Sequence, residues 1–580
     1  MFLSKNTYAK NEVTTWPIPN YWDAIALVIV LAIIILLGWS AKAVVGKFQL
    51  GQVIPISLNP DMLPYYALRT VFRLFIALGC SLVFTFIFGT WAAKSRQAER
   101  IIIPMIDILQ SVPVLGFLTI TIMGFIALFP GSMLGPECAA IFAIFTAQVW
   151  NMTLSFYQSV RSVPQDLQEA AAILQLSAWQ RFWRIDVPFA TPGLLWNMMM
   201  SMSGSWVFLV ASEAISVANQ HITLPGIGSY LAKAIETANS DAIGYVIVTM
   251  FIVIALYDQL FFRPLVAWGE KFKKETNVGD DLPESWLLNL FHRTRFFRFI
   301  GQGFALVSDA IINFKLFRLR ATRKRIQPNT ALRRAAVFLW NIILGIAVVV
   351  AAMIIYRYVF ATVSLGEGAH VLYLGFLTAL RVTVVIIISS LVWVPIGIGV
   401  GLHPKASRIV QPVAQFLAAF PVNLLFPLVV IVILRYGLDV NVWTSPLMIL
   451  GTQWYILFNV IAGTISLPKN LHHAVGTLNV KGWLWWKRFA LPGIFPYYIT
   501  GAITAAGGAW NISIIAEAVS WGHTHLYASG IGAYIAKVSA VGDFPRLVLG
   551  IAVMSLYVFA LNRLMWRPLY NLAVERFQIR

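Results

Sequence analysis

The chain has 580 residues, of which 59% are apolar and only 12% are charged. Soluble globular proteins carry about 25% charged residues. This composition, with a mean hydropathy of +0.75, therefore excludes a soluble enzyme, a disordered protein and a disulfide scaffold. The sequence predicts an all-α, polytopic membrane protein.

Basic residues outnumber acidic ones, 43 against 24, which gives a formal net charge of +19. Cytoplasmic loops of membrane proteins collect Lys and Arg, so this excess does not indicate a nucleic-acid partner. Cys80 and Cys138 lie in apolar segments without metal-ligand spacing, and we expect no metal site.

Twelve segments are long and apolar enough to cross a membrane, which takes about 20 residues. They are residues 22–45, 66–93, 102–129, 138–160, 189–217, 241–262, 335–361, 375–402, 408–436, 443–466, 493–519 and 546–566. When the N-terminus is placed in the cytoplasm, most Lys and Arg residues fall in the loops and ends on that side. Both termini are therefore predicted to be cytoplasmic.

The first of these segments ends in Ser40-Ala41-Lys42-Ala43, a pattern that resembles a signal-peptidase site. More than twenty residues precede the segment, which is long for the n-region of a signal peptide, and a matching segment occurs at 335–361. We expect the first segment to be retained as a membrane span.

The sequence contains an internal repeat. Residues 206–216 and 510–520 share Trp, Glu, Ala and Ser at an offset of 304. The same offset relates Gly226-Ile227-Gly228 to Gly530-Ile531-Gly532, two motifs that we expect to form tight turns. The repeat predicts two six-helix units that cross the membrane in the same direction, related by an axis along the membrane normal.

Upstream of these segments the offset changes. It is 308 for Pro113 and Pro421, and 312 for Ala67-Leu68-Arg69 and Ala379-Leu380-Arg381. Small differences in loop length between the two copies account for such changes.

The repeat divides the chain into a first unit over 1–269, a linker over 270–334 and a second unit over 335–580. Residues 270–285 are polar and charged, whereas 286–325 alternate aromatic and basic residues. The second stretch fits an amphipathic helix on the anionic headgroups of membrane lipids. A disordered basic linker is the alternative.

The loop between the fourth and fifth spans, residues 161–188, is long. It contains Glu169-Ala170-Ala171, and we expect a helix to start there because a carboxylate stabilises a helix N-terminus. Gln175 follows, and Pro188 is placed to open the next helix. The second copy, over 467–492, contains His473-Ala474-Val475, Asn479 and Pro492.

These loops resemble the EAA loop in the permease subunits of binding-protein-dependent ABC importers. That loop reads Glu-Ala-Ala, three residues, Gly, and then a hydrophobic residue and Pro. Glu169, Ala170, Ala171 and Pro188 match it, and Gln175 stands at the Gly position. In the second copy, His473 replaces Glu, Ala474 is retained and Asn479 replaces Gly. The Gly-Ile-Gly motifs resemble the nitrate, sulfonate and taurine branch of these permeases.

The resemblance implies the type I ABC importer transmembrane fold, in the inner membrane, with the two loops docked on two separate ATPase subunits. The chain has no Gly-x-x-x-x-Gly-Lys-Ser/Thr phosphate loop. We therefore expect no ATPase activity and no cofactor in this chain, with ATP and Mg²⁺ bound by the partner. An extracytoplasmic solute-binding protein would deliver a small solute, such as nitrate, a sulfonate or bicarbonate.

Glu213 and Glu517 are ionisable groups in the fifth spans, which makes them functional candidates. Pairing with a basic residue is the structural alternative. Neutral side chains near them could line an anion pathway at a small desolvation cost, or could simply form a core seam. These pathway candidates are Ser205, Trp206, Ser212, Trp510, Asn511 and Ser513.

Arg69 and Arg381 begin the second spans, where they could form an outer gate for anions or extend to the lipid headgroups. His523 and His525 lie two residues apart without a third ligand nearby, so a metal site there is not expected.

Two other protein classes stay open. A major-facilitator secondary transporter would share the six-plus-six topology. However, residues 94–100 read Lys-Ser-Arg-Gln-Ala-Glu-Arg instead of the motif typical of that family. A membrane-bound enzyme would need a cluster of His, Asp and Glu at a helix end, and the sequence does not suggest one.

Overall fold

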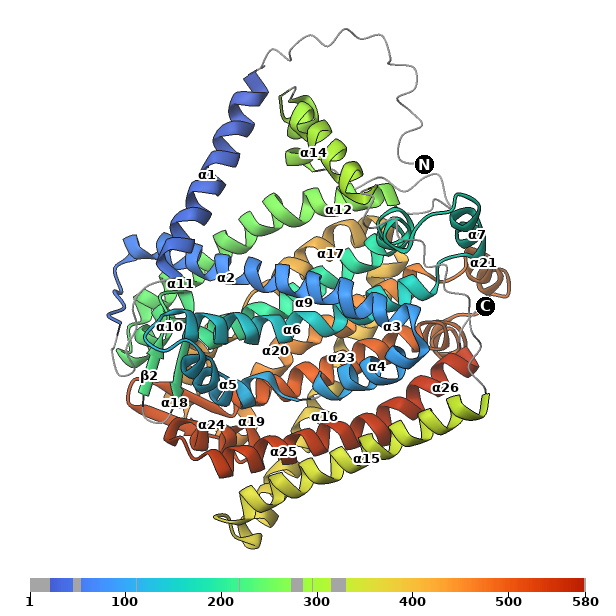
Figure 1. Cartoon of the computed structure of the whole chain (residues 1–580). Helices are drawn as coiled ribbons and strands as arrows, with labels where there is room; N and C mark the ends of the chain where they lie inside the picture. Colours follow the sequence, from blue (N-terminus) through green and yellow to red (C-terminus); the bar gives the residue numbers. More distant parts are fainter. Residues whose placement is uncertain are drawn as a thin grey trace. The chain divides into compact units, whose positions relative to one another are not determined.

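The computed structural model describes residues 21–44, 54–110, 112–217, 220–272, 285–294, 296–313 and 330–577. Helices dominate these residues, with two short antiparallel hairpins (Figure 1). The prediction of an all-α polytopic protein is confirmed. Residues 273–284 and 314–329 of the predicted linker lie outside the described residues.

The first half contains twelve helices and one hairpin among the described residues. They are α1 (Tyr21–Val44), α2 (Leu63–Phe84), α3 (Thr90–Lys94), α4 (Arg96–Leu109), α5 (Val114–Leu128), α6 (Leu134–Arg161), α7 (Gln165–Ile173), α8 (Ala178–Arg181), α9 (Val187–Glu213), β1 (Ala214–Val217), β2 (Gln220–Thr223), α10 (Ile227–Glu236), α11 (Ser240–Tyr257) and α12 (Arg263–Gly269). In the linker, α13 (Trp286–Arg293) and α14 (Phe296–Ile312) follow.

The second half is built in the same order. Its elements are α15 (Thr330–Phe360), α16 (Leu365–Leu402), α17 (Pro404–Ala419), α18 (Phe426–Tyr436), α19 (Val440–Trp443), α20 (Ser445–Ile465), α21 (Lys469–Thr477), α22 (Gly482–Trp485), α23 (Leu491–Ala516), β3 (Ala518–Trp521), β4 (Thr524–Tyr527), α24 (Ile531–Val541), α25 (Phe544–Leu561) and α26 (Arg567–Phe577).

The chain divides into two compact units. The smaller comprises Met1–Ala41, Gln158–Trp196 and Leu256–Lys324, and the larger comprises Lys42–Tyr157, Asn197–Ala255 and Arg325–Arg580. The larger unit thus contains parts of both sequence repeats.

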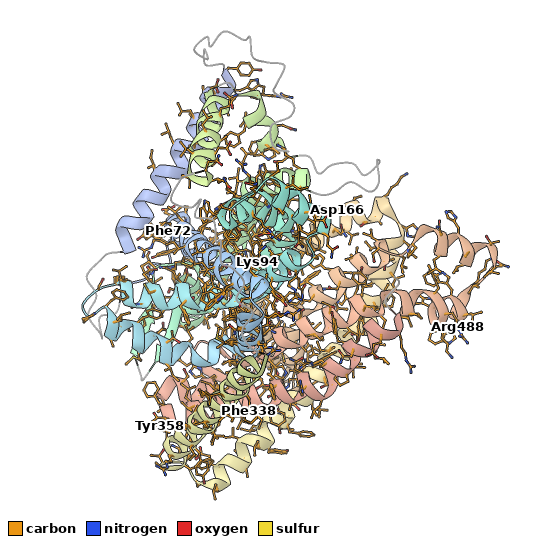
Figure 2. All side chains as sticks on the ribbon, turned by 45° about the vertical axis from the view of Figure 1, so that its right-hand side comes forward. Phe72, Lys94, Asp166, Phe338, Tyr358 and Arg488 are labelled. Carbon is orange, nitrogen blue, oxygen red and sulfur yellow. The ribbon has the colours of Figure 1, made fainter. Side chains whose placement is uncertain are left out.

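Eight helical stretches within the described residues are long and apolar enough to cross a membrane, or nine if one bent pair counts as a single span. The eight coincide with eight of the predicted spans. Two further predictions, 22–45 and 335–361, correspond to α1 and α15. On α15, apolar side chains such as Phe338 and Tyr358 are exposed (Figure 2), a surface that suits surrounding lipid.

The remaining two predictions, single spans at 102–129 and 408–436, are wrong in detail. The first is divided into α4 and α5, and the second into α17 and α18, which are bent by 74°. A proline stands at each break, Pro113 and Pro421, in an extended conformation. Proline disfavours the helical conformation in the preceding residue and lacks the N–H that a continuing helix needs.

The repeat is visible in the backbone. The elements from α7 to α12 and from α21 to α26 begin at positions that differ by 304, starting with Gln165 and Lys469. In both copies a π-helical turn, which is wider than an α-helical one, ends two residues before a proline. These turns are Phe182–Asp186 before Pro188 and Trp486–Ala490 before Pro492. The wide turn accommodates a proline that lacks an N–H and would crowd the carbonyl four residues earlier.

Helices α16, α20 and α23 form the core of the second half. Glycines allow close approach, because an added Cβ on Gly501 would lie 2.8 Å from the Tyr455 carbonyl oxygen, and one on Gly397 would lie 2.8 Å from Val460 Cγ1. Small residues permit such close packing between membrane helices.

In the smaller unit, α13 packs on α1. Ala26, Leu287 and Leu290 are buried together, and the Arg293 guanidinium lies 5.2 Å from the Trp22 ring centroid.

Candidate functional site

A buried carboxylate lies at the C-terminal end of α9. Glu213 is fully buried and accepts hydrogen bonds from Thr70 Oγ1 at 2.7 Å, from Arg73 Nη1 at 2.6 Å and from the Gly228 N–H at 2.7 Å. Helices α2, α9 and α10 therefore meet at one carboxylate. We name these four residues, together with Arg69 and Glu137, the first carboxylate cluster.

The second half repeats this arrangement at Glu517, which follows α23. Its carboxylate accepts hydrogen bonds from Thr378 Oγ1 at 2.9 Å, from Arg381 Nη1, and from the N–H groups of Gly532 at 2.8 Å and Ala533 at 3.3 Å. These five residues are the second carboxylate cluster. The structural alternative for both glutamates, pairing with a basic residue, is the arrangement that the structure shows.

The clusters correct the alignment of the two halves. Thr70 corresponds to Thr378, and Arg73 to Arg381, so the offset in the second span is 308 and not 312. Arg69, which we paired with Arg381, corresponds instead to Leu377. The repeated pattern Thr-x-x-Arg, at the offset already found for Pro113, was the available signal for Arg73.

The first cluster contains an additional ion pair. Glu137 accepts from Arg69 Nη2 at 2.6 Å and from Arg73 Nε at 2.6 Å, and all three side chains are buried. At the corresponding positions the second half has Leu377 and, at an offset of 304, Asn441, whose carbonyl oxygen accepts from Arg381. Arg69 is only 3% exposed, so it does not extend to the headgroups.

The Gly-Ile-Gly motifs form the N-termini of α10 and α24. Gly226 and Gly530 are extended and do not form the tight turns that we expected. Their role is close approach, since an added Cβ on either would overlap the carboxylate of Glu213 or Glu517. A carboxylate at a helix N-terminus is favourable because unpaired N–H groups and the helix dipole face it.

The first loop forms a short helix, a turn and a second helix. Helix α7 begins at Gln165, four residues before the predicted start at Glu169. Glu169 and Ala170 are exposed and Ala171 is buried. Ser177 caps α8 in a capping box with Gln180, and from Ala178 the helix continues to Glu213, so Pro188 lies within a continuous helix.

The second loop has the same backbone. His473 and Ala474 are exposed on α21, and a continuous helix runs from Gly482 to Ala516 through Pro492. Gln175 and Asn479, which stand at the Gly position of the EAA pattern, both have a φ of 51°. This left-handed conformation favours Gly and tolerates Asn better than Gln, which explains the Gly in the pattern.

The larger unit contains a cavity of about 330 Å³. Trp510 and Asn511 of α23 line it, together with Trp150, Asn151 and Asn562. No Lys, Arg, Asp, Glu or His lines this cavity among the described residues. Asn511 also joins the two repeats, because its Oδ1 accepts from the Val114 N–H at 2.8 Å.

The other pathway candidates have different surroundings. Ser205, Ser212 and Ser513 are buried, and each hydroxyl donates to a carbonyl oxygen of its own helix. Trp206 is fully buried. These buried positions fit the alternative that the residues form a packed core seam.

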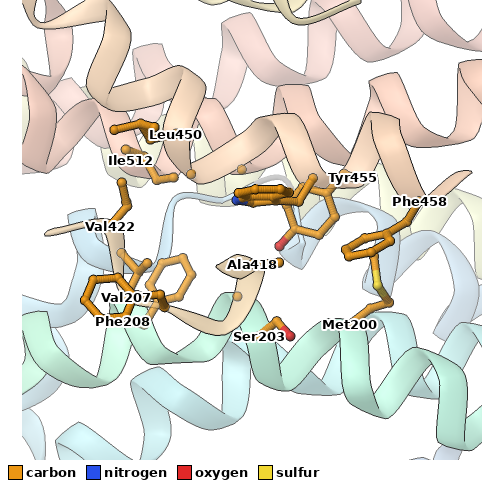
Figure 3. A pocket seen from close by; sticks show the side chains of 15 residues that line it. Met200, Ser203, Val207, Phe208, Ala418, Val422, Leu450, Tyr455, Phe458 and Ile512 are labelled. Atoms are coloured by element: carbon orange, nitrogen blue, oxygen red, sulfur yellow. The ribbon is translucent and has the colours of Figure 1, made fainter. Parts of the chain in front are cut away.

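Two further cavities lie in the same unit. A small one, about 40 Å³, is lined by residues of α9 and α20, and Figure 3 shows Phe458 of α20 beside Met200 of α9. Another of about 410 Å³ is lined mainly by small and apolar residues, including Gly228 of the first cluster, and by the polar Asn423.

His523 and His525 lie in the β3–β4 hairpin and its turn. Among the described residues no group of three His, Cys, Asp or Glu could hold a metal ion.

Apolar helices of membrane length, a duplicated architecture and a neutral polar cavity define a multi-pass membrane transport protein. The family model of the binding-protein-dependent transport system inner membrane component matches residues 85–261 and, a second time, 393–565. Because the two matches cover more than half of the chain, the chain belongs to this family, and the predicted duplicated permease is confirmed. Membership favours a transport component over the membrane-bound enzyme, since the family is a membrane component of transport systems.

Individual relatives agree with this family. The chain is 24% identical over 258 residues to the nitrate import permease protein NrtB of Synechocystis sp., covering 43% of this chain and 89% of the relative. It is 24% identical over 148 residues to the bicarbonate transport system permease protein CmpB of Synechococcus elongatus, covering 26% of this chain and 49% of the relative. It is also 24% identical over 215 residues to the trimethylamine N-oxide transport system permease protein TmoV of Pelagibacter ubique, covering 37% of this chain and 27% of the relative.

Proposed function

We propose that this chain is the translocation subunit of an ATP-driven ABC importer. The observation that carries the proposal is the duplicated exposed loop, which each repeat joins to its fifth span by unbroken helix. In the second repeat one helix runs from Gly482 to Ala516 and lines the cavity at Thr500, Thr504 and Trp510. A force applied at the loop would therefore reach the cavity wall along a single rigid element.

The energy source is proposed to be a separate pair of ATPase subunits that bind ATP and Mg²⁺. The absence of a phosphate loop from the 580 residues supports this arrangement. The two loops and both termini then lie in the cytoplasm, as the distribution of Lys and Arg favours. The carboxylate clusters lie at the far ends of the fifth spans, on the side where an extracytoplasmic solute-binding protein would dock.

The solute is proposed to be a small anion such as nitrate, bicarbonate or a sulfonate. The solutes in the names of two relatives support this class. The cavity also fits, because amide groups of Asn151 and Asn562 and indole N–H groups can donate hydrogen bonds to an anion. Neutral donors would bind an anion weakly enough for release, which a translocation pathway needs.

The test is reconstitution in liposomes with the ATPase subunits from the same source and the binding protein. We expect ATP hydrolysis to depend on the chain, and uptake of labelled nitrate or bicarbonate to depend on ATP. Trp510→Phe should weaken uptake by about tenfold in KM, the value of one hydrogen bond to a charged solute. Trp206→Phe, at the corresponding buried position, is the matched control and should leave KM unchanged.

Uptake that a proton gradient drives without any ATPase would refute the proposal. ATP-dependent uptake of trimethylamine N-oxide, with no uptake of either anion, would retain the importer and replace the solute class.

A further inference from the structure

The two docking helices differ in charge at corresponding positions. Helix α7 contains Asp166 and Glu169 and no basic residue. Helix α21 contains Lys469, His472 and His473 and no acidic residue. The two helices thus carry opposite chemistry.

Their backbones, in contrast, are the same. Both helices are nine residues long, both are followed by a residue with a φ of 51°, and both lead into a wide π-turn. Both also expose a leucine at the same place, Leu174 at 70% and Leu478 at 74%. Each loop thus offers the same apolar anchor in the same shape, and the difference between them lies in the charged side chains.

The charged side chains are on the surface that a partner would contact. Asp166 and Glu169 are exposed on α7, and His473 is exposed on α21 (Asp166 is marked in Figure 2). Asp166 and Glu169 are exposed acidic groups with no basic residue on their own helix, so they can select a partner by charge.

The rest of each loop extends the contrast. From Leu467 to Pro492 there is no Asp or Glu, and Lys481, Lys487 and Arg488 are exposed (Arg488 in Figure 2). From Val163 to Pro188 there are three acidic and two basic residues. Trp483 is 74% exposed on the second loop, whereas its counterpart Trp179 is half-buried in an aromatic cluster with Phe182 and Trp183.

We propose that the two loops dock on two different ATPase chains, which differ in the charge of their docking clefts. The cleft for α7 carries basic side chains, and the cleft for α21 carries carboxylates. A single cleft would place like charges together with one of the two loops, which disfavours binding and is a common source of partner selection. This inference rests on the proposed function, since it presumes docking of the loops on ATPases.

The experiment begins with the full chain, tagged and purified in detergent from its own cells. Mass spectrometry of the intact complex then identifies every co-purified chain that contains a phosphate loop, and its copy number. We expect two different ATPase chains, one copy of each. One ATPase chain present in two copies would overturn the inference and retain the proposed function, whereas a complex without any ATPase would overturn both.

Exchange of the charges assigns each ATPase to its loop. Asp166→Asn with Glu169→His gives α7 the chemistry of α21, and should reduce one of the two ATPase chains in the complex by at least about tenfold. His473→Glu with Lys469→Gln makes the reverse change and should reduce the other chain. Because Asp166, Glu169 and His473 are exposed, the variants should fold, which the unchanged elution volume of the chain would verify. Equal loss of both ATPases in each variant would contradict selection by charge.

Discussion

The second carboxylate cluster is held by a buried charge pair between Glu517 and Arg381. Glu517→Gln retains the shape of the side chain and removes its charge. The guanidinium of Arg381, whose side chain is only 9% exposed, then loses its ion pair with Glu517 and keeps the carbonyl oxygens of Asn441 and Ser529. Removing one partner of a buried ion pair costs about 3–5 kcal/mol, and the two carbonyl contacts favour the lower end.

The same substitution in the first cluster should cost less. After Glu213→Gln, Arg73 still donates from Nε and Nη2 to Glu137, at 2.6 and 2.8 Å. The loss is then that of a hydrogen bond to a charged group, about 1.5–3 kcal/mol. The two halves are thus expected to respond unequally, by up to about 1.5 kcal/mol.

Thermal unfolding of the purified chain in detergent, followed by tryptophan fluorescence, measures this difference. With an unfolding entropy of about 2.1 cal/mol/K per residue, one kcal/mol shifts the Tm of a chain of 580 residues by about 1 °C, so Glu517→Gln should lower Tm by about 1 °C more than Glu213→Gln. Glu236→Gln, at a side chain that is 66% exposed, is the surface control. Adding Arg381→Leu to Glu517→Gln should restore part of the loss, because it removes the unpaired charge. An equal or larger loss for Glu213→Gln would refute the reasoning.

The remaining predictions concern the loops and the glycine motif. Gln175→Gly should relieve about 1 kcal/mol of left-handed strain and slow hydrogen exchange of the loop amides, with a smaller effect for Asn479→Gly; faster exchange would contradict it. Gly532→Ala should destabilise by about 1–3 kcal/mol, because the added methyl overlaps the Ser513 carbonyl oxygen. Gly476→Ala, with open space around it, should leave Tm unchanged or raise it. Asn313→Ala removes the acceptor for Gln180 and Arg184, and should speed proteolysis within 178–186 while sparing the second loop.

Much of the fold could be predicted because it depends on hydropathy and repetition. The eight predicted spans that form single helices are long apolar runs. The offset of 304 found in the sequence also separates the elements α7–α12 from α21–α26. The breaks at Pro113 and Pro421 were not predicted, because the mean hydropathy of about 20 residues does not detect a change in helix direction. Both prolines were visible in the repeat, and their restriction of the preceding residue was the signal.

The carboxylate clusters could be predicted only in part. Glu213 and Glu517 were found because a charge within an apolar span is unusual. Arg73 was missed because the tripeptide Ala-Leu-Arg, at 67–69 and 379–381, suggested an alignment four residues away. Four residues are close to one helical turn, so both alignments place an arginine on the same helix face, and only the contact with the carboxylate distinguishes them.

The residues that differ between the two carboxylate clusters indicate that both clusters must be balanced in charge. The first has two arginines and two glutamates, and the second has one of each, with Leu377 and Asn441 in place of Arg69 and Glu137. Each cluster is neutral, so the halves differ by a complete ion pair. A buried charge without a partner is costly, whereas the exchange of a whole pair for uncharged residues is close to neutral.

This constraint predicts strong coupling between two residues of the first half. Arg69→Leu alone leaves the cluster with an excess negative charge, and Glu137→Asn alone leaves it with an excess positive charge. Arg69→Leu leaves Glu137 its two hydrogen bonds from Arg73 and should cost about 1.5–3 kcal/mol. Glu137→Asn removes the carboxylate that Arg69 binds and should cost about 3–5 kcal/mol. The double variant reproduces the chemistry of the second half and retains the Arg73–Glu213 pair, at 2.6 Å, so its loss should be smaller than that of either single variant. A double-mutant cycle on Tm or urea resistance measures this coupling, and additive losses would show that charge balance is not what the clusters conserve.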